Sequence, residues 1–416
     1  MLTRWLYTLL LFILLPLVPA KLLWRARRQP EYRQHWGERF GFYPPLLTPY
    51  SSPLIWLHCV SVGETRAVVP LVALLQERYP QHRILLTHGT PTGRATSEQL
   101  FGDKVLRCYL PYDLPFAVGR FLRHFQPQIG LLMETELWFN LIAQCNTRRI
   151  PLLLVNARLS EKSARAYAWL DGLTRQGLHQ LAGIAAQTEQ DAARLRALGA
   201  EKVIVTGNLK FDIALPADNA QLRTLFGAHR PIFLAASTRD GEEELILDAV
   251  ASANIEGLLT VIVPRHPQRF DAVAALLEKR GLRYAKRSKL SPTKETVSVL
   301  LGDSMGELFS YYSACDLAFI GGSLLPYGGQ NLIEACALGK PVLLGPHTHN
   351  FAEASVQAIA AGAALRVDDT GQLAKTLQHL LSNADERERM GAAGKVFAEA
   401  NRGAAARTLQ LIEKLI

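Results

Sequence analysis

Short apolar segments alternate with amphipathic, helix-length stretches along most of the chain. The apolar segments are rich in Val, Ile and Leu, and apolar residues recur three or four positions apart in the stretches between them. This alternation is typical of β-α-β units, in which buried parallel strands are joined by helices. It predicts strands at residues 54–60, 84–87, 105–110, 129–133, 152–155, 184–186, 203–206, 232–236, 258–263, 297–301, 317–320, 341–344 and 365–367.

The predicted strands form two series, separated by residues 210–230, which carry turn residues and no continuous strand pattern. A chain of 416 residues is long enough for two domains. The fold class is therefore α/β, with two Rossmann-like domains facing a cleft, and ligands are expected beyond the carboxyl ends of the strands. We expect the first domain at 29–209, the connection at 210–230 and the second domain at 231–384. Helices are expected at 385–416, where the chain has room to cross back to the first domain.

Residues 1–28 differ from the rest. Sixteen uncharged residues run from Trp5 to Ala20, and as a helix they would extend ~24 Å, less than the ~30 Å hydrocarbon core of a bilayer. They fit a short or tilted anchor, an in-plane helix, or a signal peptide cleaved after Ala20. A basic cluster follows from Lys21 to Arg33, and such clusters stay on the cytoplasmic side and bind anionic lipid. We therefore favour an uncleaved membrane-anchor helix with a cytoplasmic catalytic body.

Composition narrows the functional classes. The chain has 46 Lys and Arg against 37 Asp and Glu, a net charge of +9, which favours an acidic partner such as phosphate, nucleotide, nucleic acid or anionic membrane. The five cysteines are far apart and form no CxxC pair, so buried thiols in a reducing compartment are expected.

Several catalytic signatures do not occur in the sequence. It contains no GxxxxGK[ST] loop, no HExxH, no GxGxxG after a strand and no GxSxG elbow, which argues against kinases, zinc proteases, dehydrogenases and serine hydrolases. It also has no D-x-D pair to hold a metal under a nucleotide diphosphate. A mechanism with no metal and no cofactor is the simpler expectation.

Carboxylates follow two strands of the first series. Glu64 follows the strand at 54–60 through a Ser-x-Gly turn. Two interpretations are equally open at this position: a general base, or an acidic side chain that only offsets a helix dipole. Glu134 and Glu136 follow the strand at 129–133. One interpretation is that one of these carboxylates stabilises a cationic transition state. The alternative is that Thr135 and Glu136 cap the start of a helix.

The second series offers groups for an anion. Pro264 and Arg265 end a buried strand, and a guanidinium can grip a phosphate with two donors. Lys210 is a possible second cation or a solvated surface charge. Two further segments offer backbone donors or polar groups at helix starts: 302–307, with Met305, Gly306 and Glu307, and 328–334, with Asn331, Leu332, Ile333 and Glu334.

These pieces together resemble a known family, the 3-deoxy-D-manno-octulosonic acid (Kdo) transferases that modify the lipid A precursor of Gram-negative envelopes. The resemblance covers nearly the whole chain. It is carried by the ordered motifs WGERFG (36–41), SVGE (61–64), LPYDLP (110–115), METELW (133–138), NARLS (156–160), GNLKFD (207–212), PRHPQRF (264–270), GDSMGEL (302–308), GGQNLIE (328–334) and GPHTHNF (345–351).

The resemblance implies a two-Rossmann (GT-B type) inverting glycosyltransferase with Glu64 as catalytic base and with Glu134 and Lys210 stabilising the transition state. CMP of the donor CMP-Kdo would contact the residues named above in the segments 264–265, 305–307 and 331–334. The acceptor would be the tetraacylated lipid A precursor at the cytoplasmic face of an inner membrane, with no nucleic acid partner. The family usually has a histidine where this chain has Arg239, and commonly reads Gly-Gly-His-Asn-Pro-Leu-Glu where this chain has Gln330, Leu332 and Ile333.

Two other functions fit parts of the pattern. A two-Rossmann enzyme that uses a UDP-sugar, as a transferase or an epimerase, would share the sheets and the glycine loops. A non-catalytic basic scaffold on a membrane would need only the charge and the anchor, and it leaves the carboxylates at the strand ends unexplained.

Overall fold

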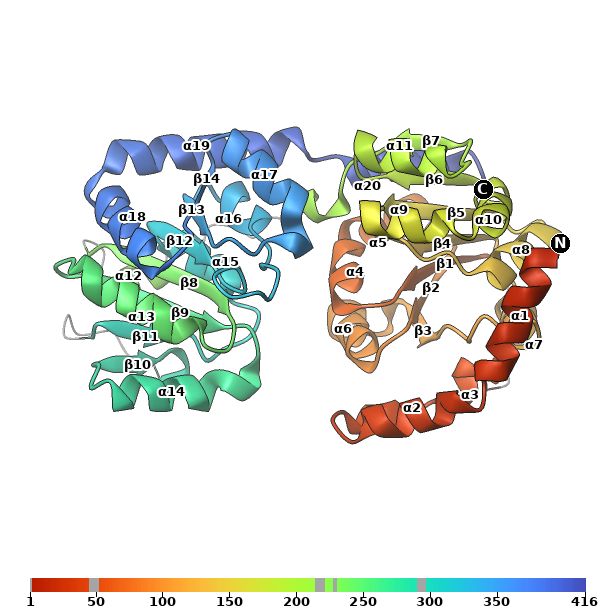
Figure 1. The fold of residues 1–416 in the computed structure, drawn as a ribbon, viewed down its shortest axis with the longest axis horizontal. Helices are drawn as coiled ribbons and strands as arrows, with labels where there is room; N and C mark the ends of the chain where they lie inside the picture. The colour runs from red at the N-terminus through yellow and green to blue at the C-terminus, as the bar shows by residue number, and fades with distance from the viewer. Residues whose placement is uncertain (1, 45–51, 214–220, 227–229, 290–296) are drawn as a thin grey trace. The chain divides into compact units, whose positions relative to one another are not determined.

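The computed structural model describes residues 2–44, 52–213, 221–226, 230–289 and 297–416, which form two compact units (Figure 1). The first unit comprises Met1–Asp212 and Arg402–Ile416, and the second comprises Ile213–Asn401. Each contains one sheet of seven parallel strands in the described residues. The prediction of an α/β fold with two parallel sheets is confirmed.

The first sheet has the strand order β3-β2-β1-β4-β5-β6-β7. Its strands are β1 (Leu54–Cys59), β2 (Arg83–His88), β3 (Leu106–Tyr109), β4 (Ile129–Met133), β5 (Leu152–Ala157), β6 (Gly183–Ala186) and β7 (Val203–Val205). Its helices are α1 (Leu2–Leu14), α2 (Leu17–Ala26), α3 (Trp36–Arg39), α4 (Val62–Ala67), α5 (Val69–Arg78), α6 (Pro91–Phe101), α7 (Pro115–Phe125), α8 (Phe139–Thr147), α9 (Glu161–Ala168), α10 (Asp171–His179), α11 (Glu189–Ala197) and α20 (Ala404–Glu413), with 3-10 turns η1 (Pro30–Arg33), η2 (Gly102–Lys104) and η3 (Leu209–Phe211).

Both faces of the first sheet are buried, and β1 shows why its sequence is almost wholly apolar. Trp56 points into a cluster with α7, α8, α10 and α11, whereas Ile55 and Leu57 point into a cluster with α4, α5, α6 and α20. Successive side chains of a strand alternate between faces, so a strand covered by helices on both sides needs apolar residues at every position.

The second sheet has the order β10-β11-β9-β8-β12-β13-β14. Its strands are β8 (Ile232–Thr238), β9 (Leu259–Pro264), β10 (Tyr284–Lys286), β11 (Val299–Leu301), β12 (Leu317–Ile320), β13 (Val342–Leu344) and β14 (Ala364–Arg366). Its helices are α12 (Gln221–Phe226), α13 (Glu242–Ala253), α14 (Phe270–Lys279), α15 (Leu308–Ala314), α16 (Ile333–Ala337), α17 (Ala352–Ala360), α18 (Thr370–Ser382) and α19 (Ala384–Ala400), with 3-10 turns η4 (Pro267–Arg269), η5 (Arg287–Lys289) and η6 (His349–Phe351).

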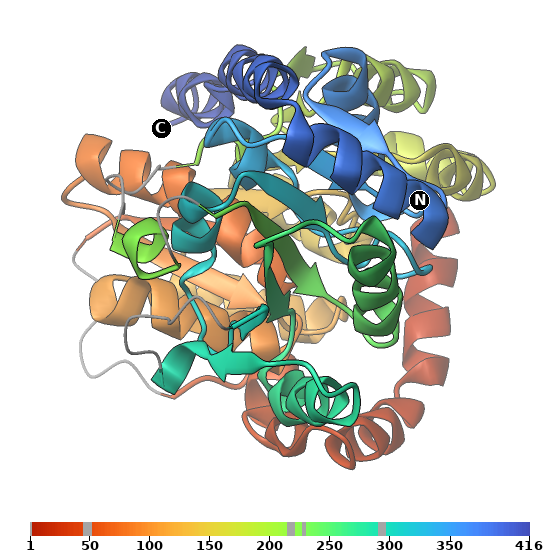
Figure 2. The ribbon, with the colours of Figure 1, turned by 90° about the vertical axis from the view of Figure 1, so that its left-hand side faces the viewer.

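Helices flank the strands of this second sheet, as the turned view shows (Figure 2). Phe233 and Ala235 of β8 pack in one buried cluster with α13, α14 and α18. The short edge strand β10 was not predicted, because its three half-buried residues are too few for a periodic pattern.

The predicted N-terminal helix is in fact two helices. α1 and α2 meet at a 56° bend around Leu15 and Pro16, and proline ends a helix because it has no N–H to donate and its ring clashes with the preceding turn. Within the described residues no single helix is long and apolar enough to cross a membrane, although this bent pair meets the criteria of length and composition when taken together.

The last 32 residues divide between the units. α19 belongs to the second unit, whereas α20 packs on α5 of the first. The chain leaves the first unit after Asp212, within the predicted connection at 210–230. Residues 214–220 and 227–229 of that connection lie outside the described residues, as do 45–51 and 290–296.

Candidate active site

Glu64 lies in the first turn of α4, directly beyond the carboxyl end of β1. Ser61 caps this helix by accepting a hydrogen bond from the Glu64 N–H at 3.4 Å. The Glu64 carboxylate in turn accepts hydrogen bonds from the Ser61 hydroxyl and from the Val60 N–H, both at 2.8 Å. This reciprocal arrangement is a variant of the capping box. Helix capping therefore accounts for part of the presence of Glu64.

The electrostatic environment of Glu64 also changes the pKa of its carboxyl group. Glu64 is only 8% exposed, and burial, followed by repulsion from Glu134, raises its pKa to about 7 although the bonds from Ser61 and Val60 oppose the shift. Burial and a like charge both disfavour the ionised form of a carboxyl group. A carboxyl group with such a pKa can accept a proton efficiently near neutral pH.

Glu134 and Lys210 lie together in the same unit. Glu134 directly follows β4 and has a φ of 58°, which is rare for a residue other than glycine, and its N–H donates to Val155 O at 3.0 Å. Its Oε1 lies 3.5 Å from the Lys210 Nζ. The cation thus faces the carboxylate that perturbs Glu64.

The position of Lys210 corrects our placement of this residue in an interdomain connection. Lys210 lies in the turn η3 of the first unit, where the Asn208 side chain accepts a hydrogen bond from its N–H at 3.0 Å. The preceding Leu209 N–H donates to the side chain of Asn156 at 2.9 Å. Asn156 sits in β5 at a φ of 52° and is fully buried. The hydrogen bond from the Leu209 backbone to Asn156 thus ties η3 to the first sheet.

In the second unit, Arg265 follows the end of β9. Its N–H donates to Thr238 O at 3.0 Å, and its Nε donates to the Gln330 side chain at 3.1 Å. The neighbouring His266 has a lowered pKa, caused by burial and by the charges of Arg239, Arg265 and Arg269. The ends of β8 and β9 therefore bring three guanidinium groups close to His266. Arg269 is paired with Glu243 at 2.6 Å and with Asp240 at 3.0 Å, and guanidinium groups of this kind suit a phosphate-bearing ligand.

The segment with Met305, Gly306 and Glu307 follows β11, which pairs with β9. Because the strands are parallel, this segment and Pro264–Arg265 lie at the same edge of the sheet. Glu307 accepts hydrogen bonds from Arg287 at 2.8 Å and from Ser304. Met305 is 54% exposed. The segment thus has a fixed carboxylate beside an accessible apolar side chain.

The segment 331–334 begins α16, and only some of its side chains can reach a ligand. Asn331 accepts a hydrogen bond from the Ile333 N–H at 3.0 Å and donates to Glu334 Oε1 at 2.9 Å. Leu332 and Ile333 are fully buried. These two residues can therefore offer a ligand only their backbone groups.

Glu242 holds two loops of the second unit together, a role that we did not predict from the sequence. Its fully buried carboxylate accepts hydrogen bonds from the Gly322 N–H at 2.6 Å, the Arg239 N–H at 2.8 Å and the Leu324 N–H at 3.0 Å. It thereby fixes the glycine loop after β12 to the end of β8. The signal was the run Glu242-Glu243-Glu244 at the start of α13, since three acids at a helix start exceed what capping needs.

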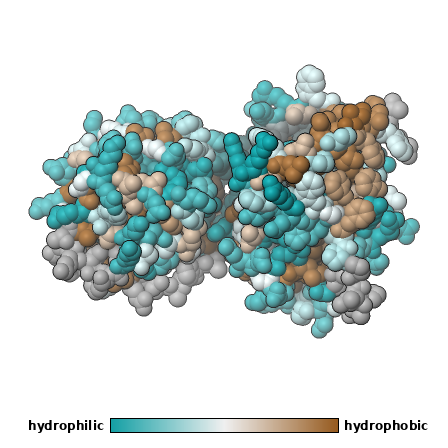
Figure 3. Space-filling view, turned by 90° about the horizontal axis from the view of Figure 1, so that it is seen from below, coloured by the Kyte–Doolittle hydropathy of each residue, from teal (hydrophilic) through white to brown (hydrophobic). Residues whose placement is uncertain are grey.

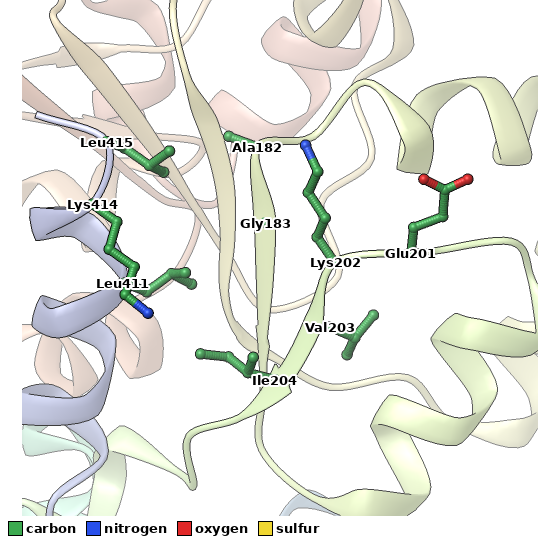
Figure 4. Close-up of a pocket in the computed structure, with 9 residues that line it drawn as sticks. All are labelled: Ala182, Gly183, Glu201, Lys202, Val203, Ile204, Leu411, Lys414 and Leu415. Carbon is green, nitrogen blue, oxygen red and sulfur yellow. The ribbon is translucent and has the colours of Figure 1, made fainter.

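An open pocket of the first unit lies away from these residues. It is lined by parts of β6, β7 and α20, with Lys202, Ile204 and Lys414 among its side chains (Figure 4). Its lining includes none of Glu64, Glu134 and Lys210. The pocket therefore adds nothing to the candidate active site.

Solved structures share the fold of this chain. A UDP-GlcNAc 2-epimerase from Neisseria meningitidis, bound to UDP-GlcNAc, is similar with a TM-score of 0.61, 18% identity and coverage of 87% of this chain and 100% of that chain. A glycosyltransferase from Rickettsia africae is similar with a TM-score of 0.60, 14% identity and coverage of 88% and 99%. At these identities the likeness shows the fold alone, which is that of two-Rossmann, GT-B type enzymes.

Sequence comparisons define the class and then the family. Residues 278–397 match the family model of glycosyl transferases group 1, and residues 34–213 match the model of 3-deoxy-D-manno-octulosonic-acid transferase (kdotransferase). The protein is therefore a glycosyltransferase.

Full-length relatives support the same family. A 3-deoxy-D-manno-octulosonic acid transferase of Bordetella pertussis is 44% identical over 99% of each chain, and one of Haemophilus influenzae is 41% identical over 99% of this chain and 98% of its own. This chain belongs to the 3-deoxy-D-manno-octulosonic acid (Kdo) transferase family.

Proposed function

We propose that this enzyme transfers Kdo from CMP-Kdo to a hydroxyl group of the tetraacylated lipid A precursor in lipopolysaccharide biosynthesis. The observation that carries the proposal is the buried Glu64 carboxyl group, whose pKa is raised to about 7 and which lies at the carboxyl end of β1. The printed names of the full-length relatives support the sugar that is transferred.

The proposed reaction is a single displacement with inversion. The Glu64 carboxylate takes the proton of the acceptor hydroxyl, and the hydroxyl oxygen forms a bond to the anomeric carbon of Kdo. The bond between that carbon and the phosphate oxygen breaks, and CMP leaves with the electron pair. One base is sufficient, since no covalent enzyme intermediate forms.

Glu134 and Lys210 have complementary parts in this proposal. The anomeric carbon becomes positively charged as CMP leaves, and the Glu134 carboxylate favours that charge. The Lys210 ammonium, whose Nζ lies 3.5 Å from the Glu134 Oε1, forms an ion pair with this carboxylate beside Glu64. We propose a metal-independent reaction, because a nucleoside monophosphate is a leaving group whose charge cationic side chains and backbone donors can stabilise.

The second unit is proposed to hold CMP. The basic cluster around Arg265 supplies charge for the phosphate, and Met305, Gly306 and Glu307 lie at the same sheet edge. Glu334 and Asn331 offer polar groups for the ribose, whereas Leu332 and Ile333 contribute backbone only. Pro264 ends β9 and so fixes where Arg265 leaves the sheet.

We also propose that α1 and α2 attach the enzyme to the cytoplasmic face of an anionic inner membrane. Large apolar side chains on these helices are exposed, including Trp5 (69%), Ile13 (64%) and Trp24 (60%). Apolar surface gathers on the first unit in the space-filling view (Figure 3). Such apolar exposure beside a basic cluster is what an in-plane membrane helix presents to anionic lipid.

The test is a transfer assay with purified enzyme, CMP-Kdo generated in situ and the lipid A precursor, read by product mass. A mass increase of one or more Kdo residues is expected. Glu64→Gln should abolish transfer while CMP still binds, whereas Glu77→Gln, on the exposed side of α5, should be as active as wild type. CMP should inhibit the reaction and UDP should not. Inhibition by UDP alone, or full activity of Glu64→Gln, would contradict the donor or the base assignment.

A further inference from the structure

The start of α8 is capped from a distance by a residue of another loop. The N-cap residue Trp138 provides no side-chain cap. Instead, Asp113 accepts hydrogen bonds from the Asn140 N–H at 2.9 Å and the Leu141 N–H at 2.8 Å, and its own C=O accepts from the Asn140 side chain at 2.7 Å. These are amides of the first turn, which have no partner within the helix. Asp113 therefore fixes where α8 begins.

Helix α1 completes this arrangement. The Tyr7 hydroxyl donates to the same Asp113 Oδ2 at 2.9 Å, and the Thr8 hydroxyl donates to the Asn140 side chain at 3.0 Å. The Tyr7 ring also packs edge-on against Phe139, with ring centroids 5.3 Å apart. Thr8 is 7% exposed and Asn140 is 4% exposed. Thr8 thus binds the first turn of α8 directly through a buried hydrogen bond, whereas Tyr7 binds the residue that caps this turn.

The loop that leads into α8 is the one that carries Glu134. Only residues 134–138 separate β4 from α8, and the loop starts at the left-handed backbone of Glu134. A shift of the helix start must therefore be taken up within these few residues. It would move the Glu134 carboxylate relative to Lys210 and Glu64.

We propose that Tyr7 and Thr8 are positioning residues for catalysis, which act through Asp113 and Asn140 on the loop that places Glu134. The inference rests on the proposed role of Glu134 in Kdo transfer. It gives the N-terminal helix a task beyond attachment to a membrane. A helix that served only as an anchor would need neither the Tyr7 hydroxyl nor the Thr8 hydroxyl.

The test uses full-length Tyr7→Phe and Thr8→Val in detergent micelles, where membrane attachment is not required. We expect kcat to fall roughly tenfold for Tyr7→Phe, since small displacements of catalytic groups are costly, and to fall in the same direction for Thr8→Val. The KM for CMP-Kdo should not change. The acid limb of the pH profile should shift as well, because repulsion from the Glu134 carboxylate contributes to the raised pKa of Glu64.

Tyr43→Phe is the matched control, since it removes another tyrosine hydroxyl of the first unit, one that donates to Tyr109 O at 3.2 Å. It should lower the melting temperature without changing kcat or the pH profile. Unchanged kcat and pH profile in both Tyr7→Phe and Thr8→Val would overturn the inference. If Tyr7→Phe does not fold, Thr8→Val decides alone. An inactive wild type would instead contradict the proposed function.

Discussion

The Nζ of Lys210 lies 3.5 Å from the Oε1 of Glu134, and Glu134 is in turn the charge that contributes most, after burial, to the raised pKa of Glu64. The three side chains come from segments after β4, after β7 and after β1. Glu134 thus connects the other two, because it forms an ion pair with Lys210 and repels the negative charge of Glu64.

Replacing Lys210 should therefore impair the chemical step. Lys210→Met leaves the Glu134 carboxylate without this cation, and we expect kcat to fall by about 100-fold, a size typical for loss of one preorganised charge. The KM for CMP-Kdo should stay the same. Steady-state kinetics check this, with Lys162→Met on the exposed side of α9 as the control. Loss of CMP binding in Lys210→Met would assign the lysine to the donor instead.

The raised pKa of Glu64 predicts a pH dependence. Transfer needs the ionised carboxylate, so kcat/KM for the acceptor should rise with pH through about 7 and then level off. Glu134→Gln removes the repulsion that disfavours the ionised form. Its acid limb should therefore lie at lower pH than that of wild type, even though its maximal rate is lower. A limb that did not move would separate Glu134 from the titrating group.

Removal of Glu242 should destabilise the second unit. Glu242→Ala leaves the buried N–H groups of Gly322 and Leu324 without their acceptor, which should cost about 3 kcal/mol or more. CMP affinity should fall as well, because the same carboxylate fixes Arg239. Thermal unfolding and calorimetric titration with CMP measure both effects. Glu244→Ala, on the exposed side of α13, should change neither quantity.

The exposed residues of α1 and α2 allow a test of membrane attachment. Ile13→Ser combined with Trp24→Ser should lower binding to anionic vesicles by roughly 100-fold, since each side chain contributes about 1.5 kcal/mol or more when it leaves water. Val396→Ser, which alters an apolar residue of the second unit that is 70% exposed, is the control. Equal sedimentation of the wild type, the double variant and Val396→Ser with vesicles would argue for another attachment surface.

The sequence predicted the sheets well because their strands are covered on both faces, and a run such as Leu54–Cys59 is then apolar at every position except His58. It also indicated Glu64 and Glu134, since a polar residue directly after such a run is conspicuous. It could not show that Lys210 faces Glu134, because that pair depends on the contact of Leu209 with the distant Asn156. The capping of α8 by Asp113 could not be predicted for the same reason, since 27 positions separate Asp113 from Asn140.

The return of α20 to the first unit bears on how the protein is made. Ala404, Ala405 and Ile412 cover an apolar face formed by Leu71, Leu75 and their neighbours, yet they follow the second unit in the chain and leave the ribosome after it. The strands of the first unit are complete by Val205. The apolar face on α5 therefore remains uncovered while the second unit is synthesised. A chain that ended at Asn401 would keep it exposed, and we expect such a chain to aggregate or to be held by chaperones.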